Sequence, residues 1–508
     1  MCNSPQAASI HVLDDDSLLH VFYLYRPFLL GEDLDEDAHM WGGDEGWQRG
    51  RWWYKLAHVC QRWRKVILRS ASYLGVSLVC TNGTRVADML AHSPSLPLAI
   101  DYRFRYFPVM AEDEKGIILA LKQHHRVHRV RLQMPITTLP KFIIAMDDEY
   151  PILEYLIIDL RIDDISLDTF LVLPEALQAP HLRHLTLVGF ALPIGSRLLT
   201  TARLMTLCLV MTHPSTYFHP NTLLQWLSLM PELETLLISH VSSVSNHDVE
   251  GQLTHTPIIT PVTLPNLRRF TFQGASTFLE AIVHWIITPR LEQLEAIFFL
   301  QLTFSVPYLL QFISTTESLR FDSALLNFTD EGVTVAFPLC DSEESEIYAV
   351  GILVQYWRLD WQVSSVAQIS NSLSSVFSAV EHLTLQHNID NSFSEEHDEV
   401  DRRTEWRKLL SSFRNVKTLR IDTGINKELS RCLELNGGEL PLEMLPELQE
   451  LTYSGSDNAA DASSFVSACQ KADRSITLGR RSPSPSPDPS SSVTISQASK
   501  EAGSDRDI

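Results

Sequence analysis

A short apolar motif recurs along most of this chain, and the repetition constrains the fold more than any other feature. In the pattern apolar-x-x-apolar-x-apolar, the last two apolar residues lie two positions apart, which is typical of a strand with one buried face. The first apolar residue can anchor the approach to that strand. Units of this size cannot bury an apolar face alone, so neighbouring units must stack and share a core. The copies begin at Val127, Leu153, Leu182, Leu204, Leu233, Leu267, Leu291, Val380, Val416 and Leu448.

The motif resembles that of leucine-rich-repeat proteins over most of residues 120–456. The resemblance implies an α/β fold class in which a small all-helical module precedes an irregular leucine-rich-repeat solenoid with helices on its convex side. The Asn that usually follows each strand in this family is nearly absent, and the spacing of the copies is uneven. We therefore expect an irregular array, with degenerate copies between residues 300 and 377, where the template finds few matches.

Side chains alternate across a strand, so the residue before the second apolar position of each copy should project from the surface. The chemistry of these residues is mixed, which suits a protein surface better than a small-molecule pocket. We predict that an unidentified protein substrate is bound by Arg129, Tyr155, His184, Arg269 and His382. The other aligned positions are Thr206, Thr235, Gln293, Thr418 and Glu450.

Two amphipathic helices are expected before the repeats. In the first, Leu18, Val21, Phe22 and Tyr25 fall at the spacing i, i+3, i+4 and i+7 of one helix face, and an Asp run occupies the first turn. The second helix, within residues 52–67, has an apolar stripe formed by Leu56, Val59, Cys60, Trp63 and Ile67. Two helices this short bury too little surface to be stable alone, so they need a partner.

These two helices resemble an F-box. The residues that match its pattern are Leu13, Leu18, Val21, Phe22, Val59, Cys60, Trp63 and Arg64. Residues 80–84 and 96–102 extend the similarity to the F-box proteins of mushroom-type fungi. The chain departs from the family in two respects, because Asp14 stands where Pro is usual and an acidic insertion at 31–50 separates the helices.

The F-box resemblance implies the substrate-recognition subunit of an SCF-type, cullin-based E3 ubiquitin ligase. In that role a Skp-type adaptor is bound by Leu13, Leu18, Phe22, Val59 and Trp63, and the repeats hold the protein to be ubiquitinated. The chain is then a connector in the cytoplasm or nucleus, with no catalytic residues, metal or cofactor. Two alternatives stay open: a repeat scaffold that binds proteins without a ligase role, and an enzyme, for which no motif speaks.

Composition argues against several other classes. A formal net charge of −21 disfavours nucleic acid and anionic membranes as partners. Seven scattered Cys without a CxxC pair argue against a disulfide framework and a structural zinc site. His124, His125 and His128 lack carboxylate or Cys ligands at a suitable spacing. Residues 296–313 carry no charge but are interrupted by polar residues, so we interpret them as buried core and not as a membrane span.

Shifts in composition also suggest domain boundaries. The expected units are an F-box module at 9–75, the repeats at 76–456, a polar join at 457–478 and a disordered Ser/Pro-rich tail at 479–508. The tail has almost nothing to bury, so the entropy cost of ordering it would not be offset. Its candidate phosphorylation sites, each followed by Pro, are Ser482, Ser484 and Ser486.

Overall fold

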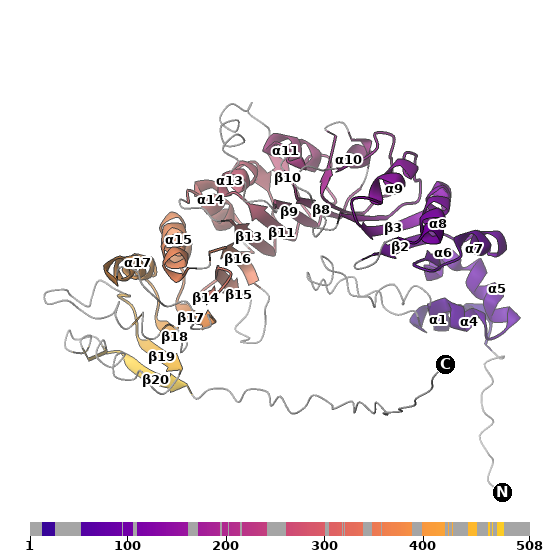
Figure 1. Cartoon of the computed structure of the whole chain (residues 1–508). Helices are drawn as coiled ribbons and strands as arrows, with labels where there is room; N and C mark the ends of the chain where they lie inside the picture. The colour runs from indigo at the N-terminus through magenta and orange to yellow at the C-terminus, as the bar shows by residue number, and fades with distance from the viewer. Residues whose placement is uncertain are drawn as a thin grey trace, which may run out of the picture.

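The computed structural model shows an arc of strands and helices (Figure 1). The residues that it describes are 13–25, 52–93, 95–104, 109–160, 171–193, 196–201, 203–213, 216–240, 261–299, 304–316, 318–319, 321–338, 348–356, 358–388, 399–421, 425, 429, 445–454, 466–467, 470 and 475–481. The acidic insertion at 31–50 and the three Ser-Pro serines lie outside the described residues.

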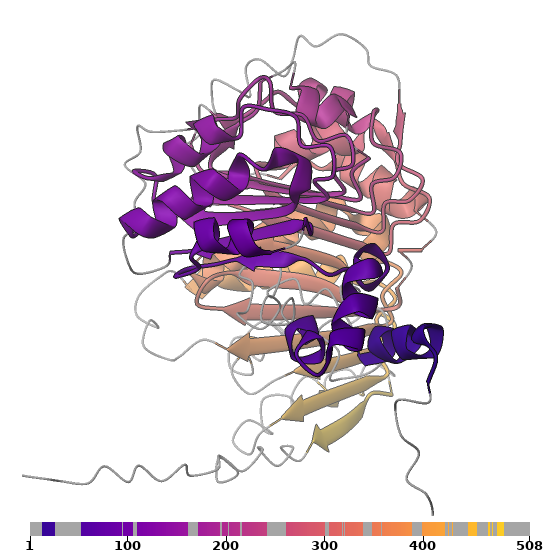
Figure 2. The ribbon, with the colours of Figure 1, turned by 90° about the vertical axis from the view of Figure 1, so that its right-hand side faces the viewer.

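Within the described residues, one sheet of 16 strands runs along the arc. In spatial order its strands are β1 (Leu78–Cys80), β2 (Leu98–Arg103), β3 (Val127–Met134), β4 (Tyr155–Leu160), β6 (His184–Val188), β8 (Thr206–Met211), β9 (Thr235–His240), β11 (Arg269–Gly274), β13 (Gln293–Phe298), β16 (Tyr348–Val354), β15 (Val333–Pro338), β14 (Ser323–Thr329), β17 (His382–Asn388), β18 (Thr418–Ile421), β19 (Glu450–Ser454) and β20 (Thr477–Arg481). Figure 2 shows these strands stacked one above another. Two short parallel pairs lie outside this sheet: β5 (Leu171–Val172) with β7 (Phe190–Ala191), and β10 (Val262–Thr263) with β12 (Ile286–Ile287).

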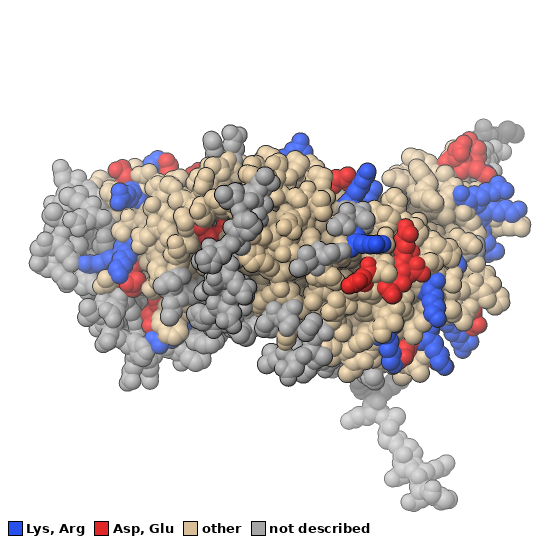
Figure 3. All heavy atoms as spheres, turned by 90° about the horizontal axis from the view of Figure 1, so that it is seen from above, with Lys and Arg blue, Asp and Glu red and all other residues tan. Residues whose placement is uncertain are grey.

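Helices line the outer side of the arc and strands line its inner side (Figure 1). The outer helices are α7 (Val86–His92), α8 (Ala111–Leu121), α9 (Leu139–Ala145), α10 (Arg197–Thr201), α11 (Pro220–Leu227), α13 (Ser276–Val283), α14 (Pro307–Thr315), α15 (Leu359–Ser372), α16 (Ser374–Phe377) and α17 (Glu399–Ser411). A short 3-10 turn, η3 (His124–Arg126), precedes β3. Seen from above, acidic and basic side chains lie in scattered groups of both signs (Figure 3).

The apolar motifs become strands of this sheet because their period matches the pleat. Leu207 and Leu236, from adjacent copies, are register partners on β8 and β9, and both are fully buried. The first apolar residue of a copy closes a tight turn before the strand, as where the amide of Leu233 donates to the carbonyl of Met230. The spacing of apolar residues therefore sets which face of each strand packs against the core.

The expected architecture is wrong, although the chain is α/β overall. It is not a small all-helical module followed by an irregular leucine-rich-repeat solenoid, because it forms one large sheet of mixed strand direction. β15 pairs antiparallel with both β14 and β16, whereas the other neighbours in the sheet are parallel. In place of the degenerate copies expected between residues 300 and 377, the described residues form the strands β14, β15 and β16 and the helices α14, α15 and α16. Within the sheet, β16 is the spatial neighbour of β13.

The amino-terminal helices share the core of the sheet and are not a separate all-helical unit. They are α1 (Asp15–Tyr25), α4 (Trp52–Ala57), α5 (Gln61–Arg69) and α6 (Ala71–Leu74). The indole Nε1 of Trp53 donates to the carbonyl of Ser77 at 3.2 Å, just before β1. Leu18, Ile67 and Leu74 belong to a hydrophobic core that continues into the strands. Helices this short gain most of their stability from such tertiary packing.

The carboxy-terminal end of the sheet differs from the expected boundary. Residues 477–481 pair with β19 as strand β20, so the first three residues of the expected tail, 479–481, belong to the sheet. Residues 477–481 are mostly polar, so backbone hydrogen bonds to β19, more than burial of side chains, hold this segment in the sheet. The rest of the tail lies outside the described residues.

Within the uncharged stretch at 296–313, the described residues include the end of β13 and most of α14, and 300–303 lie outside the described residues. Ala296 and Phe298 on β13, and Phe312 on α14, are buried in the common core. In the part of the chain that the structure describes, no helix has the length and apolar character needed to cross a membrane.

Candidate functional site

The first candidate surface is an apolar side of α1. Leu18 and Phe22 are 0% and 1% exposed, whereas Val21, Leu24 and Tyr25 are 43%, 65% and 57% exposed. The last three lie at i, i+3 and i+4, so they share one side of the helix, which we call the α1 apolar face. A helix with two apolar sides buries one in its own fold and leaves the other to water or to a partner.

The five residues predicted to bind an adaptor fall into two groups. Leu13 and Val59 are 36% and 59% exposed at this end of the molecule. Leu18 and Phe22 lie in the core, and the half-buried Trp63 packs edge-on against Phe22 with ring centroids 5.0 Å apart. Leu18 and Phe22 therefore hold the helices together, while Leu13 and Val59 remain accessible.

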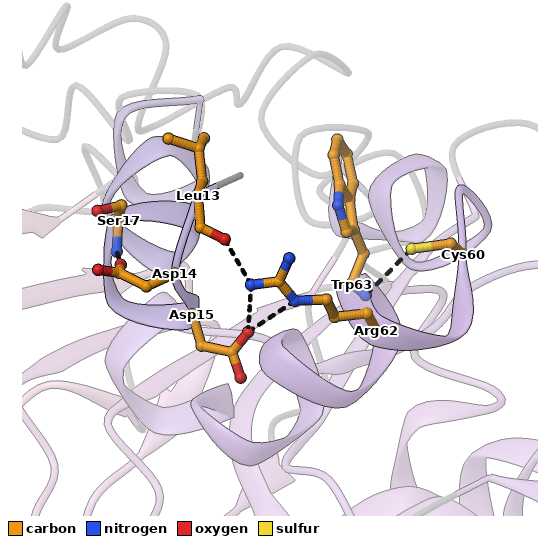
Figure 4. A network of polar contacts seen from close by, with 7 residues as sticks. All are labelled: Leu13, Asp14, Asp15, Ser17, Cys60, Arg62 and Trp63. Carbon is orange, nitrogen blue, oxygen red and sulfur yellow. Dashed lines mark hydrogen bonds and ion pairs between the residues drawn. The ribbon is translucent and has the colours of Figure 1, made fainter. Parts of the chain in front are cut away.

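Arg62 fastens α1 to α5 (Figure 4). Its Nη2 donates to the carbonyl of Leu13 at 2.6 Å, and its Nε donates to Oδ1 of Asp15 at 2.8 Å. The ion pair is exposed, so its charge adds little stability. The planar guanidinium nevertheless engages two groups at the start of α1, and it thereby fixes the position of the α1 apolar face relative to α5.

Asp14 and Cys60 each cap a helix. Oδ1 of Asp14 accepts the amide of Ser17 at 2.7 Å, and this hydrogen bond to the ionised carboxylate lowers the pKa of Asp14 below its ordinary value. Sγ of Cys60 accepts the amide of Trp63 at 3.5 Å at the start of α5. Asp14, which stands where the F-box family usually has Pro, thus begins α1 by capping it.

The second candidate surface is a row of residues on the face of the sheet away from the buried motif leucines. Each member is the register partner of the next, from β3 to β13. All seven are half-buried, which leaves part of each side chain accessible. We call this row the strand column, and it consists of Arg129, Tyr155, His184, Thr206, Thr235, Arg269 and Gln293.

Direct contacts join the first four members of the strand column. The guanidinium carbon of Arg129 lies 4.0 Å from the ring centroid of Tyr155. The rings of Tyr155 and His184 are stacked, with centroids 4.3 Å apart and an interplanar angle of 9°. Nδ1 of His184 lies 3.1 Å from the hydroxyl of Thr206. Adjacent parallel strands place these side chains about 4.8 Å apart, which is close enough for stacking.

His382 belongs to a separate part of the same face. It pairs in register with Ser323 and with Thr418, and its Nδ1 lies 2.7 Å from the hydroxyl of Thr418. The row continues to Glu450 and Thr477. The antiparallel strands β15 and β16 lie between this row and Gln293. The structure therefore brings four of the five predicted substrate residues into one column and places His382 apart from them.

Polar residues flank the strand column at its β2–β4 end, and the sequence analysis missed them. The buried carboxylate of Asp101 accepts Nε of Arg103 at 3.2 Å, and Nε2 of Gln133 donates to Oδ2 of Asp159 at 2.7 Å. Arg131 is the register partner of Asp101. These residues lie two or four positions after the column along their strands, so the alternation that located Arg129 could also have located them. The sequence analysis also missed Leu24, which the helical spacing of three residues from Val21 could have located.

Other reactive side chains are engaged in packing. Burial lowers the pKa of His128 and of His240 to about 4 and raises the pKa of Cys208 to about 12. Nδ1 of His128 lies 2.9 Å from the carbonyl of Leu98, while Nδ1 of His124 lies 3.1 Å from Oδ2 of Asp148, so the two rings engage different partners. Among the described residues, no group of three or more His, Cys, Asp or Glu is placed to hold a metal ion.

Comparison with known proteins adds no further support for one family over another. No protein-family model matches the chain, and no curated protein is significantly similar to it.

Proposed function

We propose that the chain is the substrate-recognition subunit of an SCF-type, cullin-based E3 ubiquitin ligase and acts in the cytoplasm or nucleus. Its amino-terminal end binds a Skp-type adaptor, and the face of the sheet that carries the strand column binds the protein to be ubiquitinated. In this proposal the chain joins two proteins and performs no chemistry itself. The observation that carries the proposal is the α1 apolar face, because a helix anchored in the core on one side keeps exposed apolar side chains on the other.

The size of this apolar surface is sufficient for a measurable effect on binding. Complete burial of a large aliphatic side chain stabilises a complex by roughly 1.5–3 kcal/mol. Val21 and Leu24 are already partly covered, so the two together should contribute about 2 kcal/mol. A difference of about 1.4 kcal/mol corresponds to a tenfold change in affinity. Replacing both residues by Asp should therefore weaken adaptor binding at least tenfold.

The test is calorimetric titration of the full-length chain with a purified Skp-type adaptor. We expect micromolar or tighter binding by the wild type and at least tenfold weaker binding by the double variant Val21→Asp, Leu24→Asp. A matched control is the double variant Val172→Asp, Leu229→Asp, because both residues are half-exposed apolar side chains away from α1. Thermal unfolding of all three proteins shows whether the variants remain folded.

Absence of adaptor binding by the folded wild type would contradict the ligase role. The accessible strand column would then favour the second candidate function, a protein-binding scaffold without a link to ubiquitination. Equal weakening by the control variant would show that the α1 apolar face is not the binding site.

A further inference from the structure

The strand column is positively charged in an acidic protein. Between Arg129 and Gln293 it contains two Arg and one His and no Asp or Glu, although the whole chain has a formal net charge of −21. The column differs in charge from the whole chain because register pairing brings together one residue from each of seven strands that are distant in sequence. A local excess of positive charge favours a partner with negative charge.

The carboxylates beside the first strands of the column have partners of their own. Asp101 is paired with Arg103, and Asp159 accepts a hydrogen bond from Gln133. Arg131, in the row next to the column, adds a further positive charge beside Asp101. At the other end, Glu295 lies two positions after Gln293 on β13, so the positive character is strongest between β3 and β11.

The positively charged end of the column is also pre-ordered. Arg129 lies over the ring of Tyr155, which in turn stacks on His184, and His184 contacts Thr206. Planar groups held in a stack lose less conformational entropy when they bind a ligand than free side chains do. Arg is also the residue best suited to a carboxylate, because its planar fork can donate two parallel hydrogen bonds.

The geometry sets the length of a matching ligand. Arg129 and Arg269 are separated by five strand intervals, through Tyr155, His184, Thr206 and Thr235. At about 4.8 Å for each interval the two guanidinium groups lie roughly 24 Å apart along the column. An extended peptide rises about 3.3 Å for each residue, so about seven residues cover this distance.

We propose that the strand column binds an extended, acidic peptide segment of the target protein, with carboxylates about seven residues apart that pair with Arg129 and Arg269. This inference rests on the proposed function, since the segment is the part of the target that the chain recognises. The Tyr155–His184 stack and the Thr hydroxyls contact the uncharged middle of the segment.

Fluorescence anisotropy of a labelled eight-residue peptide tests the proposal with the full-length chain. The probe consists of Ser, Thr and Ala with Glu at both ends; the control peptide has Gln at both ends, and a third peptide has phosphoserine there. We expect the Glu peptide to bind at least tenfold more tightly than the Gln peptide and to weaken as salt is raised. Tighter binding by the phosphoserine peptide would identify phosphate as the preferred anionic group on the same site.

The double variant Arg129→Gln, Arg269→Gln should weaken binding of the Glu peptide at least tenfold. Arg268→Gln is the matched control, because Arg268 is an exposed neighbour of Arg269 that pairs with Glu292. It should change the affinity less than twofold. Arg129→Lys keeps the charge but loses the planar fork, so an intermediate loss is expected even if the double variant does not fold.

Equal binding of the Glu and Gln peptides by the wild type, or no binding of either, would overturn the proposal. So would equal effects of Arg268→Gln and the double variant. Adaptor binding is measured on the same preparations. A chain that binds the adaptor but not the acidic peptide keeps the ligase role and loses this inference, and the opposite result keeps the inference and removes the ligase role.

Discussion

Replacing Glu280 tests how neighbouring helices along the sheet are joined. Glu280 lies on α13, and its two carboxylate oxygens accept the amides of Tyr308 and Leu309 at 2.8 Å each. Those amides belong to the first turn of α14, whose N-cap residue, Val306, forms no side-chain cap hydrogen bond. The carboxylate of a neighbouring helix therefore acts as the N-cap of α14.

We expect Glu280→Ala to lower the free energy of unfolding by about 3 kcal/mol. A buried amide that loses its acceptor costs roughly 1–3 kcal/mol, and two amides lose theirs. Part of this cost is offset, because burial raises the pKa of Glu280 and so makes its ionised form unfavourable inside the protein. Glu280→Gln keeps one acceptor oxygen, so we expect about half the loss.

The raised pKa also gives the sign of the pH dependence. The folded chain keeps a proton on Glu280 to a higher pH than the unfolded chain does. The stability that comes from this preferential protonation of the folded chain is fully present below pH 4.5. It is lost as the pH rises through the folded pKa. The stability difference between the wild type and Glu280→Gln should therefore shrink as the pH increases across this window.

Urea unfolding followed by circular dichroism measures the global effect, and amide hydrogen exchange of residues 308–315 measures the local one. The control variant is Glu292→Ala, which removes an exposed carboxylate in an ion pair with Arg268 and should change stability by less than about 0.5 kcal/mol. If Glu280→Ala leaves the exchange of the Tyr308 and Leu309 amides unchanged, the capping argument is wrong.

Three further predictions concern the sheet. Leu236→Ala, in the core, should cost about 2–5 kcal/mol in urea unfolding, and the half-buried Leu237→Ala distinctly less; equal losses would contradict the assignment of faces. As the pH falls from about 6.5 to about 4, His128 and His240 should each lower the free energy of unfolding by up to about 3 kcal/mol, because in this range only the unfolded chain protonates these two residues. In His240→Gln, the free energy of unfolding from urea titrations should therefore depend less steeply on pH. Gly189→Ala should cost about 1–2 kcal/mol or more, since φ is 79° and an added Cβ would lie 2.8 Å from the side chain of Leu160; a melting temperature equal to that of the wild type would contradict this.

The ten copies of the apolar motif predict ten strands of the sheet and the buried side of each, and six further strands of the described sheet lie outside the motif: β1, β2, β14, β15, β16 and β20. The apolar motif depends on residues two and three positions apart, so the pattern is complete within a few residues and needs no knowledge of the rest of the chain. Alignment of the motif also located Arg129, Tyr155, His184 and Arg269, which the structure pairs in register.

The order and direction of the strands depend on tertiary packing. β14 alternates buried and half-buried residues as the motif strands do, whereas β15 and β16 contain runs of three and four consecutive buried residues. No short pattern of this kind specifies whether a strand pairs parallel or antiparallel with its neighbour. The same limit applies to α1, where Leu18 and Leu24 are both apolar and only the packing of α5 and the sheet buries the first and exposes the second. Strand pairing and burial are relations between segments far apart in the chain, so their outcome depends on the free energy of the whole packed core and not on any short pattern.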